Sequence, residues 1–491
     1  MPANTQQSFP PKSSRPDLVN GPIAKTLLMF ALPVLGSNIL QSLNASVNAI
    51  WVGHYLGEAA LTATSNANII LFFLLGVVFG ISMATTILVG QSIGGRDINR
   101  AKRVVGTGAT FFATLSILVA AAGYIFTPHI LAMMQTPADA APYAIAYLRI
   151  IFIALPMMYF YNFMMMTLRG AGDSRTPFYF MLLSVGLDIA LNPLLIFGLG
   201  PVPAMGIAGS ALATLIAQSG SLLLMIAFLY RRKHFLALHS NELNYLKPDL
   251  TILRALVLKG LPMGLQMLVI SSSALVMISL VNGYGSQVTA GYGVTSQLWT
   301  YVQMPALALG ASVSSMAAQN IGAGRWDRVS RIAGIGVGYN FLLTGALVAL
   351  LYLFDHAALG LFLPHEGEAM AVARHINNIV AWSFVLFGVT MVLFGVVRST
   401  GAVMAPLVTL FIAIWLVRLP FAKWLMPTYG AEAIWWSFPL GSVVLIVLAM
   451  AYYRYGGWRK AHMLAAQPRG LAPDTGMATP AMTAVDEKPA S

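Results

Sequence analysis

Asp188 has the clearest chemical potential of any residue in this sequence, because it lies inside a long apolar stretch. The sequence has 16 aspartate and glutamate residues, and Asp188 is the only one that we place well inside an expected membrane span. A charge at that depth costs about 2.5–3.5 kcal/mol, so an intramembrane carboxylate is by default a candidate functional group. Asn192 follows four residues later on the same helical face, and Pro193 removes a backbone donor beside it. The pair predicts a polar site within the membrane.

The composition places this site in a polytopic membrane protein. Of the 491 residues, 58% are hydrophobic and 9% are charged, whereas a soluble protein carries about 25% charged residues. The net charge of +12 does not indicate nucleic acid, because the basic residues lie in loops between apolar stretches. Cysteine is absent from the sequence, which excludes disulfides, thiol catalysis and the common cysteine-based zinc sites. We expect no enzymatic activity and no metal centre other than a possible sodium ion at Asp188.

We expect an all-α fold, because the apolar stretches have the length of membrane-spanning helices. A span needs about 20 mainly apolar residues, and twelve stretches meet this length. They lie at about 25–54, 62–89, 104–126, 142–167, 177–200, 206–230, 253–282, 288–318, 330–354, 372–397, 403–426 and 432–454.

The distribution of basic residues predicts the orientation in the membrane. Most of the 28 lysine and arginine residues fall in alternate loops and in the two tails, and such loops stay in the cytoplasm. Both termini are therefore expected to be cytoplasmic, in a plasma membrane, and a bacterial inner membrane fits best. We divide the chain into an N-terminal tail (1–24), a six-helix lobe (25–230), a cytoplasmic linker (231–252), a second six-helix lobe (253–455) and a disordered tail (456–491).

The two lobes are related by an internal repeat. Leu32-Pro33 opens the first span and Leu261-Pro262 opens the seventh, 229 positions later, and the offset is 228 between the glutamines of residues 91–94 (QSIG) and 319–322 (QNIG). An even number of spans in each half gives a parallel repeat with a pseudo-twofold axis along the membrane normal. Two such halves are typical of transporters in which one half rocks against the other around a central site.

The order and spacing of these motifs resemble the multidrug and toxic compound extrusion (MATE) family over about residues 20–460. The resemblance rests on the two Leu-Pro openings, on the repeated glutamine motifs, and on residues 47–53, 168–173, 186–193 and 206–214. It implies a transporter that exports amphipathic, often cationic, organic compounds and drugs in exchange for protons or sodium. We expect a monomer in contact with membrane lipid.

The resemblance also implies a set of site residues. Carried over by position, the cation-coupling site comprises Asp188, Asn192, Asn48 and Thr214, while Gln41, Asn44 and Asn162 line the nearby substrate cavity. The family usually has aspartate where this sequence has Asn48, so the site keeps one carboxylate. The alternative is that the asparagines only hydrogen-bond between helices, which is worth about 0.6 kcal/mol each, that Thr214 bonds its own helix, or that Asp188 pairs with Arg149.

The coupling ion follows from the chemistry of that carboxylate. An apolar surrounding disfavours its charged form, which suits a proton carrier that is emptied when a cationic substrate arrives. Sodium is the alternative, because Asp188 and the side-chain oxygens of Asn192, Asn48 and Thr214 could coordinate a hard cation. We favour the proton and expect no other cofactor.

Two further features are candidates for the substrate pathway. Residues 157–166 (MMYFYNFMMM) contain Tyr159 and Met166, and methionine and aromatic side chains form an adaptable surface for varied ligands, although for any single residue of the run ordinary packing is the better explanation. Arg418 lies deep in the eleventh span, where we expect it to bond backbone carbonyls freed by Pro420 or else to shape the pathway.

Other function classes fit the sequence less well. A lipid-linked saccharide flippase is the main alternative, but it needs several cationic residues for a pyrophosphate, and the spans offer only Arg418 and Arg149. A channel or scaffold does not explain duplicated halves around one ionisable residue. An ATP-driven pump is excluded for a single chain, because the sequence has no Walker A motif.

Overall fold

The computed structural model describes residues 16–464 except 57, 138, 199–202, 361 and 363–366, and these residues form an all-helical protein. The first half contains α1 (Ile23–Leu56), α2 (Glu58–Gly94), α3 (Ile98–Met133), α4 (Ala141–Gly170), α5 (Arg175–Phe197) and α6 (Ile207–Arg231). The second half contains α7 (Leu250–Asn282), α8 (Ser286–Gly322), α9 (Trp326–Leu353), α10 (Asp355–Gly360), α11 (Glu368–Val380), α12 (Ser383–Thr400), α13 (Met404–Phe411), α14 (Leu419–Tyr429) and α15 (Glu432–Tyr455). The expectation of an all-α membrane protein is confirmed.

The long helices form because their sequences are continuously apolar. In the described part of the chain, eleven helices are long and apolar enough to cross a membrane. The expected span at 288–318 lies in α8, which has 37 residues but is rich in glycine, serine and threonine and is not among the eleven. The expected span at 372–397 is divided between α11 and α12, with a turn at Ala381 and Trp382.

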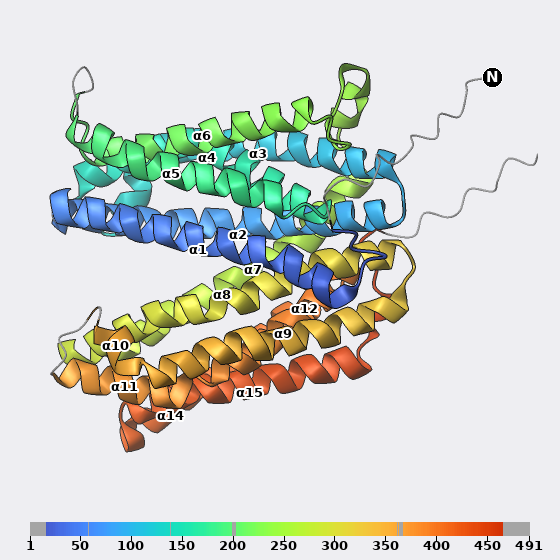
Figure 1. Ribbon diagram of the computed structural model, residues 1–491. Helices are drawn as coiled ribbons and strands as arrows, with labels where there is room; N and C mark the ends of the chain where they lie inside the picture. Colours follow the sequence, from blue (N-terminus) through green and yellow to red (C-terminus); the bar gives the residue numbers. More distant parts are fainter. Residues whose placement is uncertain are drawn as a thin grey trace, which may run out of the picture.

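The two halves form two adjacent helical bodies (Figure 1). The start of α1, the end of α15 and the segment between α6 and α7 lie at the same end of the bundle, which we call the linker end. Here α2 packs against α7 and α8, and the start of α1 packs in one hydrophobic cluster with α8, α9 and α12 of the second half. Two repeat-related glutamines cross between the halves: the side-chain amide of Gln91 donates to the carbonyl of Ser399 (2.7 Å), and that of Gln319 donates to the carbonyl of Gly170 (2.9 Å). The halves are therefore closed against each other at the linker end.

The beginning of the expected disordered tail is ordered. A short 3₁₀ helix, η3 (Gly457–Lys460), follows α15, and Trp458 is only 1% exposed in the hydrophobic cluster of the second half. Its indole nitrogen donates to the carbonyl of Tyr453 at 2.7 Å. The prediction of disorder from residue 456 is therefore wrong for residues 456–464, because a large aromatic side chain holds this segment on the protein, and residues 465–491 lie outside the described part.

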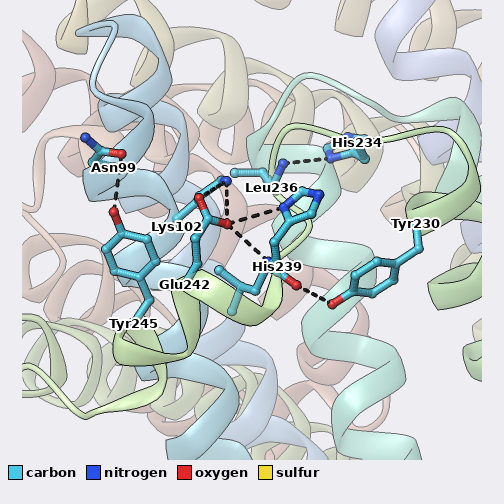
Figure 2. A network of polar contacts seen from close by, with 9 residues as sticks. Asn99, Lys102, Tyr230, His234, Leu236, His239, Glu242 and Tyr245 are labelled. Atoms are coloured by element: carbon cyan, nitrogen blue, oxygen red, sulfur yellow. Dashed lines mark hydrogen bonds and ion pairs between the residues drawn. The ribbon is translucent and has the colours of Figure 1, made fainter. Parts of the chain in front are cut away.

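The linker is fixed to the first half through a buried ion pair. Its 3₁₀ helix η1 (Ser240–Leu246) places Glu242 against Lys102 of α3, with the ammonium nitrogen 2.6 and 2.7 Å from the two carboxylate oxygens. The two side chains are 5% and 14% exposed. The backbone N–H of His239 also donates to Glu242, and Tyr245 donates to Asn99 (Figure 2). The linker is thus expected to move together with α3.

We expect Glu242→Gln to lower the stability of the purified protein by about 3 kcal/mol, because it leaves the buried Lys102 without its anionic partner. Partial burial alone would raise the pKa of Glu242, but the hydrogen bonds from Lys102 and the His239 backbone outweigh it and lower the pKa below 4.5. The contribution is therefore fully present above pH 4.5 and is lost as the pH falls through the lowered value. Thermal unfolding at several pH values measures it, with Asp327→Asn at an exposed carboxylate as the control.

Candidate functional site

Asp188 is buried, at 2% exposure, and four side chains from three helices donate hydrogen bonds to its carboxylate. From α1, the side-chain amides of Asn44 and Asn48 donate to Oδ2 at 2.8 and 2.9 Å. From α5 itself, Asn192 donates to Oδ1 at 3.2 Å, and from α6 the hydroxyl of Thr214 donates to Oδ1 at 3.2 Å. The structure therefore brings the four predicted coupling residues together and adds Asn44, which we had assigned to the cavity.

The local sequence explains how these side chains converge. Asn44 and Asn48 are four residues apart on α1, and so are Asp188 and Asn192 on α5, so each pair occupies one helical face. The Asn192 amide also donates to Asn48 Oδ1 at 2.9 Å and to the Asp188 carbonyl at 2.9 Å. Thr214 makes a second, longer contact of 3.4 Å to the carbonyl of Ser210 in its own helix, so both of the contacts considered for it occur.

The hydrogen-bond donors that the structure describes at the Asp188 carboxylate are all neutral. Among the residues that the structure describes, no lysine or arginine forms an ion pair with it. Arg149, the partner considered from the sequence, instead lies over the ring of Tyr124 with 5.1 Å to the ring centroid. Hydrogen bonds from neutral donors stabilise a carboxylate while burial disfavours its charge. Such a group can hold one proton or one monovalent cation and release it.

Two oxygen atoms beside the carboxylate have no hydrogen-bond donor. Asn44 Oδ1 and Asn192 Oδ1 are buried and unpaired, which is uncommon for buried polar atoms and calls for an explanation. They could accept the proton of a neutral Asp188, or they could join its carboxylate oxygens around a sodium ion. The donor set therefore fits both coupling ions considered from the sequence.

A cavity of about 160 Å³ lies inside the first half, next to this cluster. Its walls come from α1, α2, α4, α5 and α6, and Asn44 connects it to Asp188. Four of the five predicted cavity residues line it, namely Gln41, Asn44, Asn162 and Met166. Tyr159 does not, because its side chain is 1% exposed and packs within the hydrophobic core of the first half.

The sequence analysis missed several polar residues of this cavity, namely Ser37, Asn38, Arg169, Ser184 and Gln218. One signal was available. Ser37, Gln41, Asn44 and Asn48 follow one another at spacings of four, three and four residues, which places them on one face of α1. A continuous polar stripe on a membrane helix indicates a wet interior surface. The residues on the other helices have no comparable pattern.

Arg418 contacts a different partner from the one we expected. Its guanidinium carbon lies 3.5 Å from the centroid of the Phe438 ring, its Nε is buried without a hydrogen-bond partner, and no hydrogen bond to a backbone carbonyl is present for it in the described residues. The preceding turn, η2 (Ile412–Arg418), is a π-helix, and such turns often accommodate a helix irregularity, here next to Pro420. The expectation of carbonyl partners is therefore wrong, and a cation–π contact takes their place.

Comparisons with known proteins agree with this architecture. The family model described as MatE matches residues 33–194 and 262–424, one segment in each half. The probable multidrug resistance protein YoeA of Bacillus subtilis is 38% identical over 91% of this chain and 96% of its own length. The probable multidrug resistance protein YpnP of the same organism is 33% identical over 90% of this chain and 97% of its own. A crystal structure described as MATE in complex with MaL6 superposes with a TM-score of 0.84 at 21% identity, covering 90% of this chain and 98% of that one.

Proposed function

Because the chain belongs to the MatE family, we propose that it is a secondary active antiporter that exports amphipathic organic compounds, many of them cationic, in exchange for a proton or a sodium ion. Similar proteins described as probable multidrug resistance proteins support the substrate class. The observation that carries the proposal is the buried Asp188 carboxylate, surrounded by neutral donors and one side chain away from a cavity.

The geometry supports exchange by competition for one negative charge. A cationic compound in the cavity lies near Asp188, separated from it by the Asn44 amide. One carboxylate compensates one positive charge at a time, so a cationic compound and a coupling ion exclude each other electrostatically. If the halves alternate between closure at the linker end and closure at the opposite end, the site opens to one side at a time. The compound leaves on the open side, and the coupling ion enters from the same side. We favour the proton. A protonated Asp188 needs one hydrogen-bond acceptor, and either of the two unpaired amide oxygens beside it supplies one.

We also propose that one chain suffices for transport, in the orientation with both termini in the cytoplasm. The Asp188 cluster and the cavity are built from α1, α2, α4, α5 and α6 of a single half. The flippase alternative needs several cations at one place, whereas the described cavity lining holds one, Arg169, and Arg418 and Arg149 lie on the rings of Phe438 and Tyr124 in different halves.

The coupling ion is tested by flux through the purified protein in proteoliposomes loaded with ethidium. In the absence of sodium, we expect ethidium to move at least about fivefold faster with a pH gradient than without one, because one proton is exchanged at the single carboxylate. A sodium gradient without a pH gradient is the second arm. Movement driven only by sodium would reverse our preference for the proton, and movement indifferent to both gradients would contradict antiport.

A further inference from the structure

Arg169 is a buried cation for which the described part of the chain offers no anionic partner. It lies in the last turn of α4, its residue is 8% exposed, and it lines the cavity of the first half. Its Nε has no hydrogen bond, and its Nη1 makes a weak contact with Met166 Sδ at 4.0 Å. Within the described residues no carboxylate forms an ion pair with it. An uncompensated buried charge is costly, so the position demands an explanation.

The second half shows what a satisfied arginine looks like at the same place. Arg398 is the repeat equivalent of Arg169, 229 positions later. Its Nε donates to the Phe394 carbonyl at 3.1 Å, and its Nη1 donates to Gln266 Oε1 at 3.2 Å. Gln266 is in turn the repeat equivalent of Ser37. The serine is too short to reach a guanidinium, and its hydroxyl donates to the Pro33 carbonyl of its own helix instead.

The cavity around Arg169 has the polarity of a site for an anionic group. Arg169 is the only charged residue in its lining, and the other polar members are hydroxyls and amides. Tyr161 and Ser184 can donate hydrogen bonds there. The volume of about 160 Å³ is below the roughly 300–1,000 Å³ of a site that encloses a drug-sized ligand. It therefore encloses only part of a drug-sized compound.

We propose that Arg169 binds the anionic group of the exported compound, so that the preferred substrates are zwitterions that carry a carboxylate together with a cationic, apolar body. This inference rests on the proposed export function and specifies its substrate class. A guanidinium pairs with a carboxylate through two parallel hydrogen bonds. Asn44 is part of the same lining and contacts Asp188, so the carboxylate lies at Arg169 while the cationic body extends toward the negative charge.

The test compares two dyes that differ in one ester bond. Rhodamine B carries a free carboxylate beside its delocalised cation, and its methyl ester carries the cation alone. Fluorescence anisotropy with the purified full-length protein is expected to give a dissociation constant about tenfold lower for rhodamine B than for the ester, because the charge-assisted pair exists only for the free acid. Equal affinity for the two dyes, or no binding of either, would overturn the proposal.

Three variants separate binding from structure. Arg169→Gln is expected to abolish the preference, because the acid loses its charge-assisted pair. Ser37→Gln supplies the amide that Arg398 has and should abolish the preference with the arginine intact, so the test does not depend on Arg169→Gln folding. Arg398→Gln is the matched buried-arginine control and should keep the preference. A preference that persists in folded Arg169→Gln and Ser37→Gln would contradict the proposal. The proposed export function is tested separately by ion-driven ethidium flux and would stand after that outcome.

Discussion

Asp188→Asn is expected to abolish ion-driven export while the protein remains folded. The asparagine keeps the shape of the side chain, but it removes the negative charge that four donors surround at 2.8–3.2 Å. Without that charge neither a proton nor a sodium ion is held, and the coupled flux should fall by about a hundredfold or more, as expected for an intramembrane carboxylate that carries the ion. Ethidium flux in proteoliposomes under a pH gradient measures the loss.

The variant should unfold at the wild-type temperature or above it, because it no longer buries a charge. Asp355→Asn is the matched control, since Asp355 is also buried (9% exposed) but pairs with Arg374 at 2.7 Å, and we expect it to keep coupled export. A second variant, Asp188→Asn with Asn48→Asp, returns the charge to the same cluster and should recover part of the flux. Coupled export at the wild-type rate in Asp188→Asn would show that the carboxylate is not the ion carrier.

The sequence predicted the parts of this structure that depend on local composition. Long apolar stretches predicted the helices, and the spacing of Asp188 and Asn192 predicted that the two share one helical face. That Asn48 would meet them was implied only by the resemblance. A single carboxylate in an apolar span is a strong signal, because burial makes an accidental charge costly. The resemblance supplied Thr214, for which the spacing alone gave no evidence.

The parts that the sequence did not predict depend on packing between distant elements. Tyr159 and Met166 belong to the same apolar run, yet only Met166 faces the cavity, because neighbouring helices decide which face is enclosed. Arg169 lies at the end of an expected span, where a basic residue normally indicates a loop in water. Its burial depends on the helices that pack around the cavity, and its missing partner becomes visible only when the two halves are compared.

The closure of the halves at the linker end leads to a second prediction of large effect. Gly94 ends α2 and Gly322 ends α8, and they are repeat equivalents. A side-chain carbon on Gly94 would overlap the carbonyl oxygen of Gln319, and one on Gly322 would overlap that of Gln91. The side chain of Gln91 donates across the interface to the carbonyl of Ser399, and that of Gln319 donates to the carbonyl of Gly170. Two glycines therefore permit the close contact, and two glutamines hold it.

We expect Gly94→Ala to disfavour the conformation that is closed at the linker end and to reduce export by about tenfold or more. The clash is with backbone, which cannot move aside without separating the helices, and overpacking of this kind costs about 1–3 kcal/mol. A shift of about 1.4 kcal/mol changes the ratio of two conformations tenfold. A transporter that must pass through both conformations slows when either becomes rare.

Spin-label distances across the linker end measure this shift directly. The sequence has no cysteine, so labels on cysteines introduced at Arg100 and Arg331, which are both exposed and lie in different halves, report without background. Gly94→Ala should lengthen the distance between them relative to the wild type. Gly334→Ala is the control, because an added carbon there meets no atom within 4 Å, and it should change neither distance nor export. An unchanged distance and flux in Gly94→Ala would mean that the glycine contact does not limit closure of the halves.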